Sequence, residues 1–385
     1  MDIITNTDAL KQICSQLETC SFVTVDLEFL REKHYYAQLC LIQIGSKTSS
    51  YIIDPLSPDI KLQPFFDLMH NPNIIKVFHS GRQDIEIIYN LSGIIPYPLF
   101  DTQIAAMVCG YGESISYENL VLYLLHRKLD KTNRLSDWSK RPLSDSQLNY
   151  ALSDVTHLVE IYEILSQKLK DNKRSSWINE EINILTSPST YIINPQDAWT
   201  RIKHRSHSAK FLTILRELAA WREHRSQTKN TPRQSYIKDD ALLNICACDP
   251  QTKEQLCQIR NLRADVAKGK LGDEILEVLE HCRHIPESDY VTPPKIKDLP
   301  DKSSSLFELL KLLLKIISQQ QGVVARLIAT DENLHDFSIF KDQDNHILSG
   351  WRYDIFGKHA QDLRHGNLSI TYNPKTKDIE LQHYS

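Results

Sequence analysis

The chain has 385 residues, of which 41% are apolar, and its formal net charge is −4 at pH 7. This length exceeds one ordinary hydrophobic core and predicts two or three domains, and the composition is that of a soluble globular protein. No window approaches the roughly 18 consecutive apolar residues of a membrane helix, and the start lacks the pattern of a signal peptide, so we expect a cytoplasmic protein. Its eight cysteines form no CxxC pair, so we expect reduced thiols.

The first part of the chain predicts a mixed α/β sheet. After an amphipathic helix at about residues 7 to 19, three apolar stretches separated by short polar turns favour an antiparallel meander. Strands and helices then alternate, which favours strands added in parallel to the same sheet. The meander strands are residues 21–28, 37–45 and 50–55, the later strands are 74–80 and 98–103, and the helices are about 59–69, 83–91, 103–110, 116–126 and 144–170.

An acidic pair lies on the first strand of the meander. Residues two apart in a strand share one face at about 6 to 7 Å, so Asp26 and Glu28 stand side by side while the alternate aliphatic residues face a core. Two anions this close repel each other, and the repulsion is usually relieved by protonation of one carboxylate or by a bound cation. We favour a metal ion, although an acid-x-acid pattern by itself is common in a chain with 49 acidic residues.

The helix at residues 144–170 has a clear start and an unusual face. Ser144 and Gln147 form a capping-box pattern after a proline. Tyr150 and Asp154 are four residues apart and share a face, with Cβ atoms about 5 to 6 Å apart. Aspartate is a poor helix former in mid-helix, and this local mismatch beside an apolar stripe favours a functional role.

The second half of the chain predicts small helical domains. The pattern loosens over residues 171–208, which we interpret as a linker after an α/β domain at 1–170. Helical patterns follow in 209–290 and 305–385, separated by a stretch rich in Pro, Lys and Ser. Residues 237–245 weakly resemble residues 329–337, each after a helix, so two all-α domains in tandem are expected.

Three acidic motifs then occur in a telling order: DLE at residues 26–28 on a strand, HSGRQD at 79–84 where a strand passes into a helix, and YxxxD at 150–154 on the capped helix. They resemble the DEDD exonucleases of the ribonuclease H-like fold, in the subgroup with tyrosine in the third motif. Nearly the whole chain resembles ribonuclease D, including helical HRDC domains, with the second HRDC copy only loosely similar. The stretches that carry this resemblance are residues 26–45, 78–86, 100–121, 129–158 and 215–233.

The resemblance implies a ribonuclease H-like α/β exonuclease domain followed by two HRDC-type domains. It implies a 3′–5′ exoribonuclease that uses two divalent ions, Mg²⁺ or Mn²⁺, trims tRNA precursors and releases nucleoside 5′-monophosphates. Asp26 would bridge both ions, Glu28 and Asp154 would hold the ion that activates water, and Asp84 would hold the other ion through water. Tyr150 would orient the attacking water, since an ordinary tyrosine pKa near 10 makes it a poor base.

Basic side chains suggest where RNA binds, although a solvated surface explains them as well. One group precedes the third motif, and the other lies in residues 201–290, which carry 16 basic and 13 acidic side chains. We expect His79 to be a hydrogen-bonded structural residue, and the protein to be a monomer without a membrane partner. The candidate RNA contacts are Lys131, Arg134, Lys140, Arg141, Arg201, Lys203, Arg205, Arg222, Arg225, Lys229 and Arg233.

Two other functions stay open on the sequence. One is a single-strand DNA exonuclease of the same DEDD group. The other is a catalytically silent nucleic-acid adaptor built around the helical domains. Four intact acidic positions weigh against the adaptor, since a binding module has no need of clustered anions that repel one another.

Overall fold

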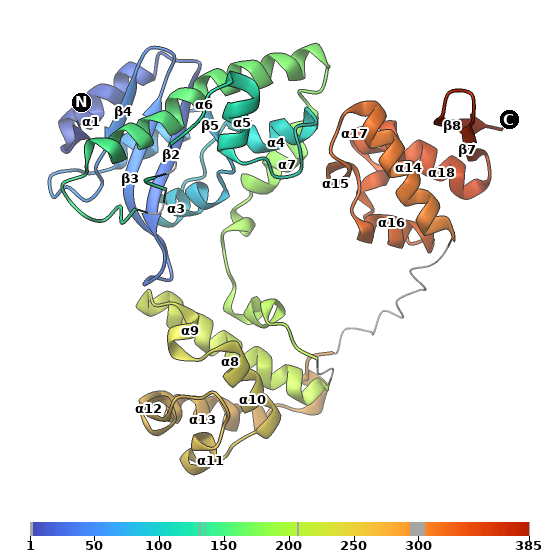
Figure 1. The fold of residues 1–385 in the computed structure, drawn as a ribbon. Helices are drawn as coiled ribbons and strands as arrows, with labels where there is room; N and C mark the ends of the chain where they lie inside the picture. The colour runs from blue at the N-terminus through green and yellow to red at the C-terminus, as the bar shows by residue number, and fades with distance from the viewer. Residues whose placement is uncertain (1–2, 131, 135, 206–207, 293–304, 385) are drawn as a thin grey trace.

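A six-stranded mixed sheet lies at the centre of the N-terminal unit in the computed structural model, which describes residues 3–130, 132–134, 136–205, 208–292 and 305–384 (Figure 1). Its strand order is β1-β4-β3-β2-β5-β6. Strands β2, β3 and β4 form the expected antiparallel meander, and β5 and β6 are added in parallel beside β2. The short strand β1, parallel to β4, was not predicted. The strands are β1 Ile3–Ile4, β2 Phe22–Leu30, β3 Gln38–Gly45, β4 Ser50–Ile53, β5 Ile75–Phe78 and β6 Leu99–Asp101.

The long helix α6 crosses one face of this sheet and contacts β2, β3 and β4. Its predicted capping box is confirmed, because the Ser144 side chain accepts from the Gln147 N–H while the Gln147 side chain accepts from the Ser144 N–H. The helix buries its apolar stripe, including Leu148, Val155 and Leu158. The helices of this unit are α1 Thr7–Leu17, α2 Gln63–His70, α3 Arg82–Ser92, α4 Thr102–Val108, α5 Tyr117–Leu125 and α6 Asp145–Asp171.

A second, helical unit has its own hydrophobic core. The segment 171–208 that leads to it is partly ordered into the helix α7, Trp177–Leu185, and two 3-10 segments. Fully buried residues such as Leu215, Leu242 and Leu279 form the core of the unit. Its helices are α8 Ala209–Lys229, α9 Arg233–Tyr236, α10 Asp239–Cys248, α11 Lys253–Cys257, α12 Ala264–Lys268 and α13 Lys270–Arg283.

The C-terminal unit is helical over residues 305–365, as expected, and ends in a β-hairpin that was not predicted. In this hairpin Leu368, Ile370 and Tyr372 alternate with polar residues, which is the period of a strand, and a polar turn connects the two strands. The elements are α14 Ser305–Gln321, α15 Ala325–Ile328, α16 Asp331–Ser338, α17 Gly350–Arg352, a π-helical turn Tyr353–Gly357, α18 Lys358–His365, β7 Leu368–Asn373 and β8 Asp378–His383.

The tip of the β2–β3 hairpin is bound to the second unit. Tyr35 donates a hydrogen bond to Glu223 of α8, a carboxylate that is 1% exposed and also pairs with Arg233. The Arg233 guanidinium lies over the Tyr35 ring, 4.8 Å from its centroid. Beside it, the Tyr36 N–H donates to the Asn230 side chain at 2.8 Å. The hairpin that begins with the acidic strand β2 is therefore fixed at its far end.

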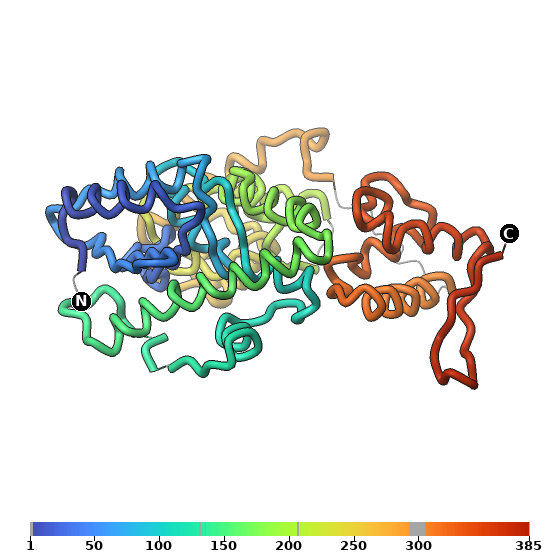
Figure 2. Tube along the Cα trace, turned by 90° about the horizontal axis from the view of Figure 1, so that it is seen from above, coloured from blue at the N-terminus to red at the C-terminus, as the bar shows by residue number. Residues whose placement is uncertain are grey.

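The C-terminal unit packs against α7 (Figures 1 and 2). The Arg352 guanidinium, 6% exposed, pairs with Glu180 and Glu181 of α7. Next to this pair the Trp177 and Trp351 rings stack with centroids 4.4 Å apart. The apolar residues of the N-terminal and C-terminal units form one continuous core, which includes Trp351 and has Trp177 packed against it.

Candidate active site

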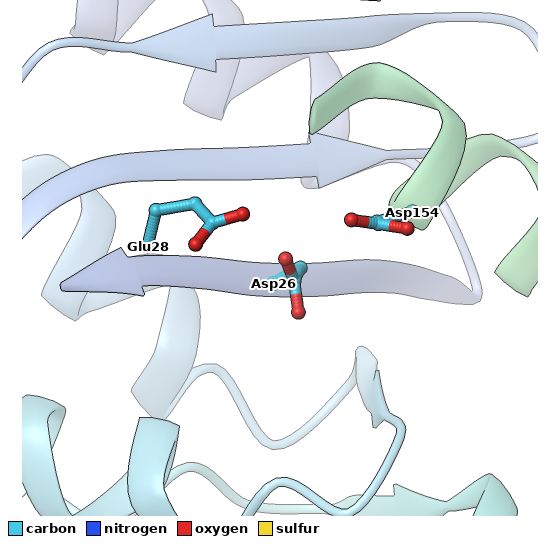
Figure 3. Close-up of side chains that lie close together, drawn as sticks. All are labelled: Asp26, Glu28 and Asp154. Atoms are coloured by element: carbon cyan, nitrogen blue, oxygen red, sulfur yellow. The ribbon is translucent and has the colours of Figure 1, made fainter. Parts of the chain in front are cut away.

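Three carboxylates meet between the sheet and α6. Asp26 and Glu28 project from β2, and Asp154 projects from α6. One carboxylate oxygen of each lies within 4.8 Å of the others. Figure 3 shows the three side chains turned toward one another, with Asp26 between Glu28 and Asp154. Among the described residues this is the one group of three or more acidic, histidine or cysteine side chains with the spacing of a metal site.

Small side chains on the sheet allow α6 to approach closely enough to place Asp154 beside Asp26 and Glu28. The Thr24 hydroxyl on β2 donates to the Val155 carbonyl of α6 at 2.8 Å. Opposite Thr24, on β3, stands Gly45. A Cβ at Gly45 would lie 2.5 Å from the Thr24 hydroxyl oxygen and 3.0 Å from the Val155 carbonyl oxygen. Gly45 therefore permits the close approach of α6 to the sheet. The hydrogen bond of Thr24 holds α6 in place at Val155, the residue next to Asp154.

Asp84 joins the cluster from the first turn of α3. Its side chain is 8% exposed, and burial, followed by the negative charge of Asp26, raises its pKa. The charge of Asp84 in turn adds to the rise in the pKa of Glu28, after burial, Asp26 and Asp154. The turn before it is held by Asp101, whose carboxylate accepts from the Gly81 N–H at 2.8 Å and from the Ser80 N–H at 3.2 Å. Asp101 is thus a supporting residue that the motif pattern did not reveal.

Burial and mutual repulsion oppose ionisation throughout the cluster. Burial raises the pKa of Asp26 to about 7. Burial and then the charges of Asp26, Asp154 and Asp84 raise the pKa of Glu28 to about 10. Burial and then Asp26 raise the pKa of Asp154 to about 9. A divalent cation would relieve this repulsion, and carboxylate oxygens are hard ligands, so the four side chains fit a divalent ion such as Mg²⁺ or Mn²⁺.

Tyr150 lies one helical turn before Asp154. Its hydroxyl donates a hydrogen bond to the Asp154 carboxylate, which lowers the pKa of that acid. Burial, followed by the charges of Asp154, Glu28 and Asp26, raises the pKa of Tyr150, so its phenol keeps its proton at neutral pH. A protonated phenol can orient a water or a phosphate by hydrogen bonding, but it cannot abstract a proton.

The predicted basic residues fall into different environments. Arg134 lines a polar pocket of about 670 Å³ together with Tyr150 and His79. Arg141 instead forms a bidentate pair with Asp54, at 2.6 and 2.7 Å. His79 hydrogen-bonds through Nδ1 to the Thr102 hydroxyl, as expected of a structural histidine, although it also faces this pocket.

The basic residues of α8 serve the second unit. Arg222 is 4% exposed, pairs with Asp239 at 2.7 Å and donates to the Ile237 carbonyl. Arg225 pairs with Glu274 at 2.6 Å. Lys131 lies outside the described residues. Of these basic residues, the structure places Arg134 in the pocket beside Tyr150.

Comparison with known proteins fits this geometry. Residues 1–170 match a family model described as a 3′–5′ exonuclease, and residues 211–279 match the HRDC domain. Ribonuclease D of Nitrobacter hamburgensis is 42% identical over 372 residues, which cover 96% of this chain and 97% of that protein. The chain belongs to the ribonuclease D family. Ribonuclease D of Jannaschia sp. is also 42% identical, over 98% of this chain and 99% of that protein.

A solved structure agrees with the same family. The crystal structure of Escherichia coli ribonuclease D, described as an exoribonuclease involved in structured RNA processing, matches with a TM-score of 0.82 and 26% identity, covering 95% of this chain and 98% of that one. The expected fold class and family are therefore confirmed, and the chain is a 3′–5′ exoribonuclease of the ribonuclease D family that depends on divalent metal. The alternatives of a DNA exonuclease or a silent adaptor are not favoured. Within the described residues, the helices are too short or too polar to span a membrane.

Proposed function

We propose that Asp26, Glu28, Asp84 and Asp154 hold two divalent ions, Mg²⁺ or Mn²⁺, and that Tyr150 positions the attacking water. When bound, such a pair of ions supplies a nucleophile at neutral pH and neutralises charge on the attacking and leaving oxygens of a phosphodiester. The observation that carries the proposal is the convergence of oxygens of Asp26, Glu28 and Asp154 within 4.8 Å, in a site where burial opposes their ionisation.

Each side chain has a role that follows from its position. Asp26 lies between Glu28 and Asp154, so its two oxygens are suited to bridge both ions (Figure 3). In this proposal Glu28 and Asp154 would hold the ion that activates water, and Asp84 would hold the other ion through water. The phenol of Tyr150, which keeps its proton, hydrogen-bonds the water and aligns it with the scissile phosphorus. Alignment of this kind lowers the barrier because it removes the freedom of the nucleophile before reaction.

We also propose that the substrates are RNAs with single-stranded 3′ extensions, including tRNA precursors, and that nucleoside 5′-monophosphates are released. The pocket beside Tyr150 is polar, and Arg134 on its wall offers a guanidinium for a backbone phosphate. We propose that the units 209–290 and 305–385 are two HRDC-type domains that hold the RNA body, and that the protein acts as a monomer in the cytoplasm.

An assay with matched nucleic acids tests this function. The purified protein is given 3′-extended RNA or single-stranded DNA of the same sequence, with Mg²⁺, Mn²⁺ or a chelator. We expect stepwise shortening of the RNA from its 3′ end, no reaction with chelator, and loss of reaction in Asp26→Ala, Asp84→Ala and Asp154→Ala. Shortening that persists in any of these variants contradicts the proposed site.

Arg134→Ala tests the proposed phosphate contact separately. The variant should weaken RNA binding and reduce the slope of log affinity against log salt by about 0.7, the value for one phosphate contact on a single strand. Lys11→Ala is the control, because Lys11 of α1 is not among the candidate RNA contacts, has a side chain 64% exposed and pairs only weakly with Asp8, at 3.8 Å. Equal slopes in Arg134→Ala and the wild type refute the contact.

A further inference from the structure

A buried glutamine faces the acidic cluster from the neighbouring strand. Gln43 on β3 stands directly opposite Asp26 in the antiparallel pair of β2 and β3. Directly opposed residues share one face of a sheet, with Cβ atoms about 4.5 to 5.5 Å apart. On its other side, Gln43 is opposite Ile52 of β4. The three residues form a row across the sheet face that α6 covers, and Asp154 descends from α6 beside this row.

The amide of Gln43 has no hydrogen-bond partner among the described residues. The side chain is 0% exposed, and both its Nε2 and its Oε1 are shielded from solvent without a partner. An unpaired buried amide costs free energy, and a leucine or methionine would fill the same space without this cost. Thr24, which precedes Asp26 by two residues on β2, differs from Gln43 because its buried hydroxyl is paired with the Val155 carbonyl. The unpaired atoms thus lie next to the metal ligands.

We propose that Gln43 is a positioning residue for the metal centre: its Nε2 donates a hydrogen bond to the carboxylate of Asp26 once that carboxylate binds metal. This inference rests on the proposed function. An ionised carboxylate has lone pairs beyond those that bind metal, and an amide N–H directed at one of them fixes the rotamer of the ligand. Asp26 needs this support most, because the proposed bridging role demands one orientation of both oxygens.

A packing role for Gln43 predicts a different metal affinity. If the side chain only fills the space between Ile52 and α6, replacing its amide with apolar atoms of similar volume leaves metal affinity unchanged. If it positions Asp26, the same replacement removes a costly unpaired amide from the metal-free protein and removes a hydrogen bond from the metal-bound protein. Stability without metal and affinity for metal then change in opposite directions.

The test uses the full-length protein and Gln43→Met, with Gln43→Leu as a second variant in case the first does not fold. Calorimetric titration with Mn²⁺ measures affinity, and thermal unfolding in chelator measures metal-free stability. We expect Mn²⁺ binding to weaken by about 10- to 100-fold, the usual effect of losing a residue that supports a metal ligand. We expect a Tm in chelator equal to or above that of the wild type, and recovery of RNA cleavage at raised Mn²⁺ concentration.

Ile52→Val is the matched control, because it removes one methyl group from the other side of Gln43. It should lower the Tm and leave Mn²⁺ affinity unchanged. If the glutamine variants bind Mn²⁺ as tightly as the wild type, or lose stability in chelator as Ile52→Val does, the positioning role is wrong. If the wild type itself shows no Mn²⁺ binding that depends on Asp26, the proposed function fails instead, so the two failures are distinguishable.

Discussion

Replacing Asp26 with asparagine should make the metal-free protein more stable while removing its response to metal. Asp26 lies at the centre of the acidic cluster, and an amide of nearly the same shape keeps the packing but carries no charge. The variant therefore separates the cost of the buried charge from the benefit of the ligand. Few positions in a folded domain are stabilised by losing a charged side chain, so the sign of the effect is informative.

The magnitude follows from the pKa of Asp26, which burial raises from 3.8 to about 7. Because the folded protein binds this proton more tightly than the unfolded chain, stability falls as pH rises from about 4 to about 7, and the full cost is present above pH 7. Each pH unit of the rise corresponds to about 1.4 kcal/mol. Because Asp26 titrates together with Glu28 and Asp154, we assign Asp26 a cost of about 1.4 kcal/mol, the value for one pH unit. This free energy corresponds to about 3 to 6 °C in Tm.

Thermal unfolding in chelator at pH 8 and at pH 4 measures the effect, with the exposed residue Asp59 changed to asparagine as control. We expect Asp26→Asn to raise the Tm at pH 8 and to change it much less at pH 4, where the folded-state carboxyl is protonated and the unfolded one is about half ionised. With Mn²⁺ at 100 times its Kd, the wild type should gain about 2.7 kcal/mol and the variant far less. A lower Tm for the variant at pH 8 refutes the reasoning.

Three further changes probe the supports of the site. Tyr150→Phe should lower kcat by about 100-fold with little change in RNA affinity, because it removes the oriented hydroxyl and keeps the ring; single-turnover kinetics and binding measurements check this. Gly45→Val should cost about 1 to 3 kcal/mol in urea unfolding and most of the activity, since its side chain collides with Thr24 and pushes α6 from the sheet. Tyr35→Phe should speed amide hydrogen exchange at the hairpin tip and in α8 without altering cleavage of short RNA, because it removes the hydrogen bond to Glu223.

Each of these predictions has an outcome that contradicts it. For Tyr150→Phe, weaker RNA binding at unchanged kcat would show that the phenol holds substrate rather than water. For Gly45→Val, wild-type stability would mean that α6 does not depend on the close approach. For Tyr35→Phe, unchanged hydrogen exchange in α8 would mean that other contacts hold the two units together.

Local patterns predicted much of the fold and the acidic site because the information lies within single elements. The alternation around Asp26 and Glu28 marks a strand with one buried face, and the capping box at Ser144 sets where α6 begins. Tyr150 and Asp154 are four residues apart, and this spacing places them on one face of α6. The resemblance to exonucleases supplied the link between the separate motifs, which periodicity alone does not provide.

Features that depend on contacts between elements were not predictable. Gln43 and Gly45 are significant only through the pairing of β3 with β2 and the position of α6, and a single sequence gives neither. The proximity of Arg222 and Arg225 along the chain suggested a basic surface, yet both side chains turn toward acidic partners within the second unit. The sequence spacing of charges does not reveal burial, and burial decides whether a charge can reach RNA.

Crystallography of the protein soaked in Mn²⁺ would test the metal site most directly, because Mn²⁺ gives an anomalous signal at its own position. The account predicts two anomalous peaks about 3.5 to 4 Å apart, with Asp26 bound to both and with Glu28, Asp84 and Asp154 around them. Peaks located elsewhere, or an acidic cluster that takes up no Mn²⁺ at concentrations that support RNA cleavage, would contradict it.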